Sequence, residues 1–339
     1  MSTKQTTPAS ISLPTYKEGA ANPQWCPGCG DFGALSAYTE ALRDLTNQEL
    51  FGKSSWEAYR FAKPLLLPDG YCQKTFLGVA PHTIVTDGGI GCMGQFPQYV
   101  NTYAVKMPHG RLLPFAAGLG AMRPDLMIFG VGGDGDGFAI GAGHIANFPA
   151  WTINITYLIA NNRVYGLTKG QTAPGSVRGT ATKGTPYGSP RHQQNFIDIA
   201  IANGWTFVAR IAVCGKTKDD FDTKKQAVEI LKQAIVHPGP SIVIDETECP
   251  TYNKEITPEY LREHVVPIDA LGPHNPADQN AASRLARVEI KEKKENIILT
   301  GVYYHAERES FHQYLGITEP LLFKRRNREE AKKLLNKFA

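Results

Sequence analysis

The sequence predicts an α/β protein built on a doubly wound parallel sheet, with a C-terminal extension after it. Two apolar runs, at 126–133 and 153–160, are nearly continuous rather than alternating. Such runs are typical of strands that are buried on both faces of a parallel sheet. Strand-like segments of this kind also alternate with helix-like segments, as in βαβ units. The composition, with 42% hydrophobic and 20% charged residues among 339, is that of an ordinary globular protein.

The first half of the chain contains four predicted elements. A polar, turn-rich stretch at 22–30 precedes an apolar-periodic helix at 32–45. The sequence HTIVT at 82–86 predicts a short strand that ends at an Asp-Gly-Gly turn. Residues 111–122, rich in Ala and Gly, predict a helix suited to close packing. The apolar run at 126–133 is the first buried strand, and it breaks into an Asp-Gly-Asp-Gly turn.

The second half continues the alternation of strands and helices. The apolar run at 153–160 is the second buried strand, and it stops at an Asn-Asn pair. The Gly-, Thr- and Pro-rich segment 166–191 is longer than an ordinary connection, which indicates a functional or a disordered loop. No internal repeat is visible. The other predicted elements are helices at 138–147, 195–203 and 218–236 and strands at 206–213 and 240–246.

The pattern predicts one main domain at 1–254 and a charged extension at 255–339 that packs on this domain or on a partner. The polar start lacks the apolar core of a signal peptide, and no apolar run reaches the roughly 20 residues that span a bilayer. We therefore expect a cytoplasmic protein without membrane contact. The basic stretch at 324–333 also contains Glu329 and Glu330 and is followed by a Leu pair, which favours a solvated amphipathic helix over a nucleic-acid site, with an acidic protein partner left open.

The turn after the first buried strand combines glycines with Asp134 and Asp136. Its glycines satisfy the dinucleotide pattern G-x-G-x-x-G, but the next strand ends in Asn161-Asn162 and lacks the acid that an NAD-binding dehydrogenase needs. Two carboxylates would repel a diphosphate unless a divalent cation lay between them. Mg²⁺ accepts carboxylate, amide, carbonyl and phosphate oxygens together. Asn162 can supply the amide oxygen, and Val164 can supply a carbonyl.

The spacing between these two turns resembles a cofactor motif. Gly133-Asp134-Gly135, 25 further residues and Asn161-Asn162 are similar to the thiamine diphosphate motif of the transketolase and 2-oxoacid-decarboxylating families. By this resemblance the sheet is of the thiamine-diphosphate-binding type. The resemblance implies that Asp134, Asn162 and the carbonyl of Val164 hold Mg²⁺ on the diphosphate, while Gly135 and Asp136 line the phosphates. The structural alternative is a glycine-rich turn with a capping aspartate.

Six cysteines are present, and a metal or redox use is more natural for them than a disulfide framework in a cytosolic chain. Cys26 and Cys29 form a CxxC in a Gly/Pro turn. No second CxxC completes a zinc ribbon, and the preceding residues do not fit a thioredoxin-like pair. A [4Fe–4S] cluster needs four thiolates, which can be remote in sequence. Two further cysteines follow strand ends, Cys92 and Cys249, and two have the surroundings of buried free thiols, Cys72 and Cys214.

Six short motifs occur in a characteristic order: CPGCG at 26–30, GIGC at 89–92, PHGR at 108–111, GGDGD at 132–136, NNRVYGLTKGQ at 161–171 and CPTYN at 249–253. Over residues 20–255 this order resembles the β subunits of 2-oxoacid:ferredoxin oxidoreductases. The resemblance assigns four thiolates to one [4Fe–4S] cluster: Cys26, Cys29, Cys92 and Cys249. It places seven residues around thiamine diphosphate: Ile90, Gly91, Cys92, Met93, His109, Gly166 and Leu167. His109 and Lys169 become candidate catalytic residues, Lys169 for a substrate carboxylate.

The form YGLTKGQ is similar to the 2-oxoglutarate and broad-specificity members of this family. The resemblance implies CoA-dependent oxidative decarboxylation of 2-oxoglutarate to succinyl-CoA and CO₂, with electrons passed through the cluster to ferredoxin. The reaction can also run as a reductive carboxylation. Pyruvate or indolepyruvate as substrate remains open. So do two hypotheses outside the family, a dehydrogenase that binds NAD and an Fe–S protein that only transfers electrons.

The sequence shows no acid for the aminopyrimidine nitrogen of thiamine diphosphate. The resemblance implies that a separate α subunit provides this acid, in a heterodimer or an α₂β₂ assembly, with the active site at the interface. No second group of clustered cysteines is present, so we expect no fused ferredoxin-like domain. The expected partners are the α subunit, ferredoxin, 2-oxoglutarate and coenzyme A, without nucleic acid.

Overall fold

The computed structural model describes residues 16–17, 19–47, 49–50, 53–54, 83–291 and 297–315. Two predicted features lie outside these residues: Cys72 and the basic stretch at 324–333. The described strands are β1 (Glu49–Leu50), β2 (Lys53–Ser54), β3 (Ile84–Gly88), β4 (Tyr103–Lys106), β5 (Met127–Gly133), β6 (Ile155–Asn161), β7 (Val164–Tyr165), β8 (Gln171–Thr172), β9 (Phe207–Ala212), β10 (Pro240–Glu246), β11 (Val265–Pro267) and β12 (Ile298–His305).

The helices and helical turns connect these strands and flank the sheet. They are α2 (Asp31–Asn47), η2 (Met93–Tyr99), α4 (Leu112–Met122), η3 (Asp136–Ile140), α5 (Ala142–Asn147), η4 (Phe148–Trp151), α6 (Phe196–Ala202), α7 (Thr223–Val236), α8 (Pro258–His264), η5 (Ile268–Leu271), α9 (Gln279–Lys291) and α10 (Phe311–Leu315). Within the described residues, no helix is both long enough and apolar enough to cross a membrane.

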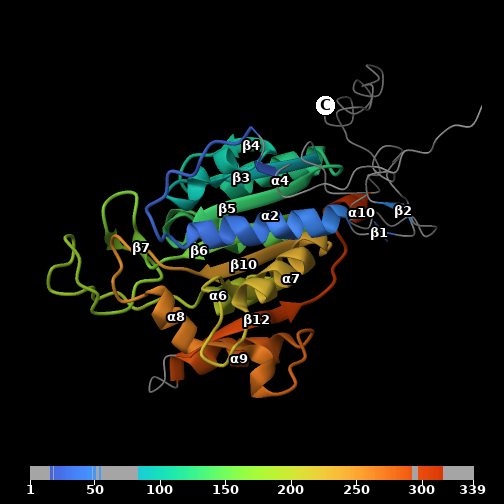
Figure 1. Cartoon of the computed structure of the whole chain (residues 1–339). Coiled ribbons are helices and arrows are strands. Elements are labelled where there is room, and N and C mark those ends of the chain that lie inside the picture. Colours follow the sequence, from blue (N-terminus) through green and yellow to red (C-terminus); the bar gives the residue numbers. More distant parts are fainter. Residues whose placement is uncertain are drawn as a thin grey trace, which may run out of the picture.

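In the part of the chain that the structure describes, eight strands form the central sheet, in the order β11-β12-β9-β10-β6-β5-β3-β4. Figure 1 labels β4, β3, β5, β6, β10 and β12 of this sheet. The six strands from β9 to β4 pair in parallel. Strand β12 pairs antiparallel with β9, and β11 runs parallel to β12, so these two reverse the direction at one edge. The predicted α/β fold with a parallel sheet is therefore confirmed, and strands from beyond residue 254 extend the same sheet.

Helices cover both faces of the sheet, which explains the continuous apolar runs. Along β6, Ile155, Tyr157 and Ile159 pack into the layer of α4, α5, α6 and α9. Their neighbours Leu158 and Ala160 pack into the opposite layer of α2, η2 and α7. Because successive side chains of a strand point to opposite faces, a strand that is covered on both sides needs apolar residues at almost every position.

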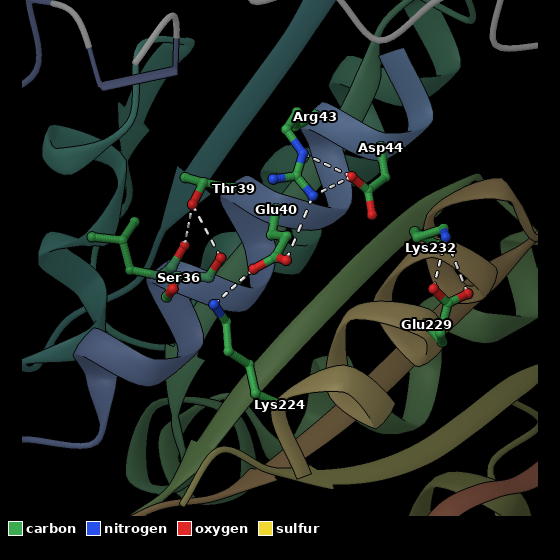
Figure 2. Close-up of polar contacts among 9 residues, drawn as sticks. Ser36, Thr39, Glu40, Arg43, Asp44, Lys224, Glu229 and Lys232 are labelled. Carbon is green, nitrogen blue, oxygen red and sulfur yellow. Dashed lines mark hydrogen bonds and ion pairs between the residues drawn. The ribbon is translucent and has the colours of Figure 1, made fainter. Parts of the chain in front are cut away.

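Helices α2 and α7 lie side by side on one face of the sheet (Figure 1). Their apolar stripes bury side chains such as Tyr38 and Leu231 completely. At the surface, Lys224 Nζ lies 2.7 Å from Glu40 Oε2 and joins the two helices, while Lys232 pairs with Glu229 within α7 (Figure 2). Surface ion pairs of this kind contribute about 0–1 kcal/mol each, so the buried stripes hold the helices together.

Two predicted helices have different boundaries in the structure. The helix predicted at 138–147 is divided into the π-type turn η3 and the short helix α5, because the Gly141 amide donates to the Asp136 carbonyl, five residues back, at 3.0 Å. The helix predicted at 218–236 begins at Thr223, because Asp222 caps it by accepting from the Lys225 amide at 3.0 Å. The preceding residues form a turn instead, closed by a hydrogen bond from the Thr217 amide to the Phe221 carbonyl.

Four elements of the sheet region were not predicted: η2 and the strands β4, β11 and β12. Strand β4 is a largely exposed edge strand, and η2 packs Met93 and Phe96 into the core although it contains Pro97. Strand β12 joins the sheet from the C-terminal part of the chain. The strand predicted at 82–86 is β3, and it continues through Asp87 and Gly88 before it ends.

Candidate functional site

The carboxyl ends of the parallel strands gather the chemically distinctive residues of the chain at one edge of the sheet. Ligands of open α/β sheets bind at this edge. The turn after β3 contains Gly89–Met93, the turn after β5 contains Asp134–Asp136, and Asn161 and Asn162 stand at the end of β6. Cys249 follows β10, which is paired with β6. Residues that are far apart in sequence therefore share this edge.

The long loop that follows β6 is built around short-range hydrogen bonds. Strands β7 and β8 form a small hairpin at its beginning. Further along, the Gly179 amide donates to the Ser189 carbonyl at 2.8 Å, and the Ser189 amide donates to the Thr180 carbonyl at 3.0 Å. Of the two predictions for segment 166–191, a functional or a disordered loop, the structure excludes disorder, because the loop is ordered beside the strand ends.

Asp134 is buried at the end of β5 and is held by two backbone amides. Its Oδ1 accepts from Gly135 N at 2.9 Å and its Oδ2 accepts from Gly175 N at 3.0 Å. Burial raises the pKa of Asp134 to about 7. A Cβ at Gly175 would lie 2.0 Å from Asn161 Oδ1 and 2.8 Å from Asp134 Oδ2, so both oxygens approach the same glycine. Buried oxygens that converge in this way suit a cation.

The two asparagines at the end of β6 have different roles in the structure. Asn162 Oδ1 accepts from Val164 N at 3.1 Å, and the Asn162 carbonyl accepts from Asn253 Nδ2 at 3.0 Å. Its amide oxygen keeps a second lone pair. Asn161 Oδ1 is buried and has no hydrogen-bond partner among the described residues. The structure therefore brings Asp134 next to Asn161 and leaves Asn162 in a tight turn that leads into β7.

A buried ion-pair network fixes Asn161 from the other side. Glu246, at the end of β10, accepts from Asn161 Nδ2 at 3.0 Å and from Arg163 Nη2 at 2.7 Å. Arg210 Nε lies 3.3 Å from Glu246 Oε1, and Arg210 also donates to the Tyr303 hydroxyl at 3.1 Å. Burial raises the pKa of Glu246, but the two guanidinium groups outweigh it, so the pKa is lowered overall.

Sequence analysis missed this network. The signal that could have found it is charged residues inside two mainly apolar strands, Arg210 in β9 and Asp245 and Glu246 at the end of β10. Ionised groups are rarely buried unless they are paired.

Asp136 joins three loops at the edge of the sheet. Its Oδ1 accepts from Ile90 N at 3.0 Å and from Gly110 N at 2.9 Å, and it lies 2.6 Å from His109 Nδ1. The Asp136 side chain is completely buried. The carboxylate of Asp136 thus contacts the turns after β3 and β4. The predicted contact of Asp136 with the phosphates stays a prediction.

A second buried acid lies beneath the same turn. Asp87 in β3 is fully buried, and neither of its oxygens has a hydrogen-bond partner among the described residues. Burial, with a smaller contribution from the charge of Asp136, raises the pKa of Asp87 to about 8. The sequence placed Asp87 in the turn after the strand and therefore did not identify it as a buried acid.

The four cysteines chosen from the sequence approach one another. A Cβ at Gly166 would lie 3.5 Å from Cys249 Sγ and 3.6 Å from Cys92 Sγ. Cys26 and Cys29 share one turn, closed by a hydrogen bond from Cys29 N to the Cys26 carbonyl at 3.0 Å. Cys29 lies close enough to the thiols of Cys92 and Cys249 for their charges to raise its pKa further. Cys214 lies elsewhere, buried beside Thr223.

The surroundings of these thiols disfavour bare thiolates. Burial, followed by the charges of Asp31 and other thiols, raises the pKa of Cys92 to about 12. Burial also raises the pKa of Cys29, and it raises the pKa of Asp31 to about 7. Thiolates in such a site need metal cations. No three His, Cys, Asp or Glu side chains in the described part of the chain are placed to hold a single metal ion. A cluster of four irons spreads its four thiolates over separate corners, so it does not need that closer geometry.

The remaining predicted residues lie around the same edge. Lys169 is exposed in a tight turn with φ of 81°, which is unusual for a residue other than glycine and is typical of functional loops. Leu167 is also exposed, whereas Ile90 and Gly91 stand in the turn after β3. The side chain of Met93 packs into the core beneath α2, so only its backbone is available at the edge.

Two family models match the chain. The model described as "Thiamine pyrophosphate enzyme, C-terminal TPP binding domain" matches residues 89–244. The model for the C-terminal part of the pyruvate ferredoxin oxidoreductase beta chain matches residues 249–319. The first match covers the turns after β3, β5 and β6, where the predicted cofactor residues lie.

Curated relatives carry related names. The chain is 36% identical, over 247 residues, to a 2-oxoacid:ferredoxin oxidoreductase subunit beta of Saccharolobus solfataricus, covering 72% of this chain and 68% of that protein. It is 35% identical to the 2-oxoglutarate oxidoreductase subunit KorB of Mycobacterium tuberculosis, over 68% of this chain and 51% of that protein.

A solved structure has the same fold over almost the whole length. It is a 2-oxoglutarate:ferredoxin oxidoreductase from Magnetococcus marinus, with 2-oxoglutarate, coenzyme A and succinyl-CoA bound. The TM-score is 0.76 at 30% sequence identity, and the match covers 96% of each chain.

Proposed function

This chain belongs to the family of 2-oxoacid:ferredoxin oxidoreductase β subunits, and we propose that it acts on 2-oxoglutarate. The proposed reaction is a reversible, CoA-dependent oxidative decarboxylation to succinyl-CoA and CO₂, with electrons passed through a [4Fe–4S] cluster to ferredoxin. The observation that carries the proposal is the meeting, at one sheet edge, of the Asp134–Asn162 region and four cysteines. No NAD-binding or purely electron-transferring protein needs both groups.

The choice of substrate rests on relatives and on one loop. KorB proteins and the Magnetococcus marinus enzyme are named for 2-oxoglutarate, whereas other relatives are named for 2-oxoacids in general. The exposed Lys169 offers a cation to the second carboxylate of 2-oxoglutarate, which pyruvate lacks. Pyruvate, indolepyruvate and several 2-oxoacids at once are the alternatives within the family.

The diphosphate and its metal fit the turns at the edge of the sheet. The carboxylate of Asp134 and the amide and carbonyl oxygens at Asn162 and Val164 are ligands that suit Mg²⁺. Bound there, thiamine diphosphate would supply the nucleophilic carbon for attack on the 2-oxo group, and the chain would supply its position and electrostatics. Asp134 is fixed by the Gly135 and Gly175 amides before any ligand binds, so its carboxylate needs little reorganisation.

The four cysteines suit a [4Fe–4S] cluster, which would lie near the proposed cofactor site. The sulfurs of Cys92 and Cys249 both lie next to Gly166, which follows the short strand β7. Because Gly166 has no side chain, nothing from this position occupies the space next to the two sulfurs. We propose that Cys26, Cys29, Cys92 and Cys249 bind one [4Fe–4S] cluster beside the reacting centre, where it can accept electrons directly.

The proposal includes partners that this chain does not contain. An α subunit would complete the active site in a heterodimer or an α₂β₂ assembly, with exposed residues of 255–291 and 297–315 at the interface. Ferredoxin and coenzyme A would be the other partners, and we propose a cytoplasmic location. The reaction in the carboxylating direction is the one used by the reductive TCA cycle.

The test is anaerobic purification together with the α subunit, followed by assays of iron, sulfide, thiamine diphosphate and CoA-dependent dye reduction. We expect about four irons per chain, as one cluster requires, bound thiamine diphosphate, and a preference for 2-oxoglutarate. A preference for pyruvate would be consistent with the family but would refute 2-oxoglutarate as the substrate. If neither cofactor were found under strict exclusion of oxygen, the proposed site would be wrong.

A further inference from the structure

The contacts of His109 and Asp136 suggest a function beyond binding. His109 lies in the turn between β4 and α4, and its Nδ1 is 2.6 Å from Asp136 Oδ1. The Asp136 side chain is completely buried, whereas about a third of the His109 side chain is exposed, at 34%. A buried carboxylate thus contacts Nδ1 of the imidazole, and part of the same side chain is exposed.

The turn that carries His109 is shaped for this contact. The Gly110 amide donates to the same Asp136 oxygen at 2.9 Å. Gly110 has φ of 69°, and a Cβ there would lie 2.5 Å from Ile140 Cγ2 and 2.6 Å from Gly141 N. Only glycine therefore fits, and its close approach to the helical turn places His109 directly over the Asp136 carboxylate.

A carboxylate accepts hydrogen bonds and cannot donate one while it is ionised. The neutral imidazole beside it therefore carries its proton on Nδ1, and Nε2 becomes the acceptor on the opposite side of the ring. A partner on one ring nitrogen sets the tautomer and the basicity of the other. The Asp136 oxygen also holds Ile90 N at 3.0 Å, so the orientation of the ring is coupled to the turn after β3.

The ring stands next to the predicted diphosphate turn. His109 and Tyr165 meet edge to face, with ring centroids 6.5 Å apart. A Cβ at Gly135 would lie 2.0 Å from Tyr165 Cε1, so Tyr165 closes over the glycine between the two aspartates. His109 therefore touches this turn directly through Asp136, and the ring of Tyr165 lies between His109 and Gly135.

We propose that Asp136 is a positioning residue that holds His109 with its proton on Nδ1, so that Nε2 can exchange a proton with the substrate or the cofactor. In this proposal the carboxylate of Asp136 does not contact the phosphates. The proposal rests on the proposed function, because the proton exchange belongs to the 2-oxoacid reaction.

Two isosteric substitutions at His109, in the complex with the α subunit, test the role of each ring nitrogen. His109→Asn keeps a donor near Nδ1 and loses Nε2, whereas His109→Gln keeps a polar group near Nε2. General acid–base residues typically contribute roughly 10²–10⁴-fold to a rate. We expect both variants to keep the Kd for thiamine diphosphate, measured by tryptophan fluorescence in the presence of Mg²⁺, and both to lower kcat at least tenfold, because neither amide can exchange a proton. A His109→Gln variant with the wild-type kcat would show that Nε2 only accepts a hydrogen bond, which would overturn the proton exchange. An unchanged kcat in His109→Asn would overturn the proposal.

Asp136→Asn, alone and combined with His109→Asn, then tests whether the carboxylate acts through the imidazole. If it does, the double variant is no slower than the slower single variant, since coupled residues are not additive. Independent, multiplicative losses in kcat would refute the coupling. An increase of more than tenfold in the Kd for thiamine diphosphate in Asp136→Asn would instead place its carboxylate at the phosphates. A wild-type complex that binds no thiamine diphosphate would refute the proposed function itself, which is a separate result.

Discussion

The Glu246 network makes a quantitative prediction about stability. Glu246→Gln leaves the size of the side chain unchanged but removes the negative charge that two buried guanidinium groups share. Arg163 Nη2 and Arg210 Nε lie 2.7 Å and 3.3 Å from the carboxylate, and the three side chains are exposed by less than a tenth. Removing one partner of a buried ion pair costs about 3–5 kcal/mol, because an uncompensated charge is left in the interior.

The expected change in melting temperature follows from the size of the chain. For 339 residues the entropy of unfolding near the midpoint is roughly 0.7 kcal/mol/K, so the loss corresponds to roughly 4–7 °C. The assay is thermal unfolding followed by circular dichroism on the purified protein. Asp220→Asn is the matched control, because its pair with Lys216 is largely exposed, and we expect no measurable shift.

The same variants test whether the charges act together. The double variant Glu246→Gln/Arg163→Gln leaves only Arg210 as an unpaired buried charge. Its loss of stability should therefore be smaller than the sum of the losses in the two single variants. A Glu246→Gln protein that melts within one degree of the Asp220→Asn control would refute the buried network. We also expect weaker binding of thiamine diphosphate with Mg²⁺, since Glu246 orients Asn161 next to Asp134.

Three further predictions concern the acids and thiols of the site. Asp134→Asn should raise the Kd for thiamine diphosphate with Mg²⁺ at least tenfold while the iron–sulfur absorbance is unchanged, and an unchanged Kd would exclude Asp134 as a ligand. Cys249→Ala should lose the cluster absorbance, whereas Cys214→Ala, a buried thiol outside the group, should keep it; the reverse pattern would show that the wrong cysteines were chosen. Asp87 has a pKa of about 8 in the folded protein against 3.8 for the ordinary carboxyl, so the folded state binds more protons between these values and stability falls as the pH rises through them. Asp87→Asn should therefore melt a few degrees above the wild type at pH 8 and close to it at pH 4, and a pH-independent difference would contradict this reasoning.

Much of the fold could be predicted because local pattern and global structure agree. The runs at 126–133 and 153–160 are apolar on both faces of their strands, and only a covered parallel sheet satisfies such a pattern. The helix at 111–122 and the strand at 240–246 were likewise predicted to within a residue. Helix starts were less certain, because the cap of α7 at Asp222 depends on a turn that periodicity does not describe.

The missed strands are either short or paired with strands that are distant in sequence. Strand β4 is short and exposed at the edge of the sheet, so no apolar run marks it. Strand β12 pairs with β9 across a long stretch of sequence, and nothing in its own residues specifies that partner. Pairing between distant strands is decided by the packing of the whole sheet.

By itself, the sequence determined the α/β class, the buried strands and the residue types of the site, because those depend on local periodicity and on the spacing of Cys26, Asp134 and Asn162. Only the tertiary structure decided which side chains share a contact. It joined Glu246 to Asn161 and Asp136 to His109, and it buried Asp87 without a hydrogen-bond partner among the described residues. The reason is physical: hydrogen bonds and desolvation act over a few ångströms in space, and only the folded sheet brings strand ends that are remote in sequence within that distance.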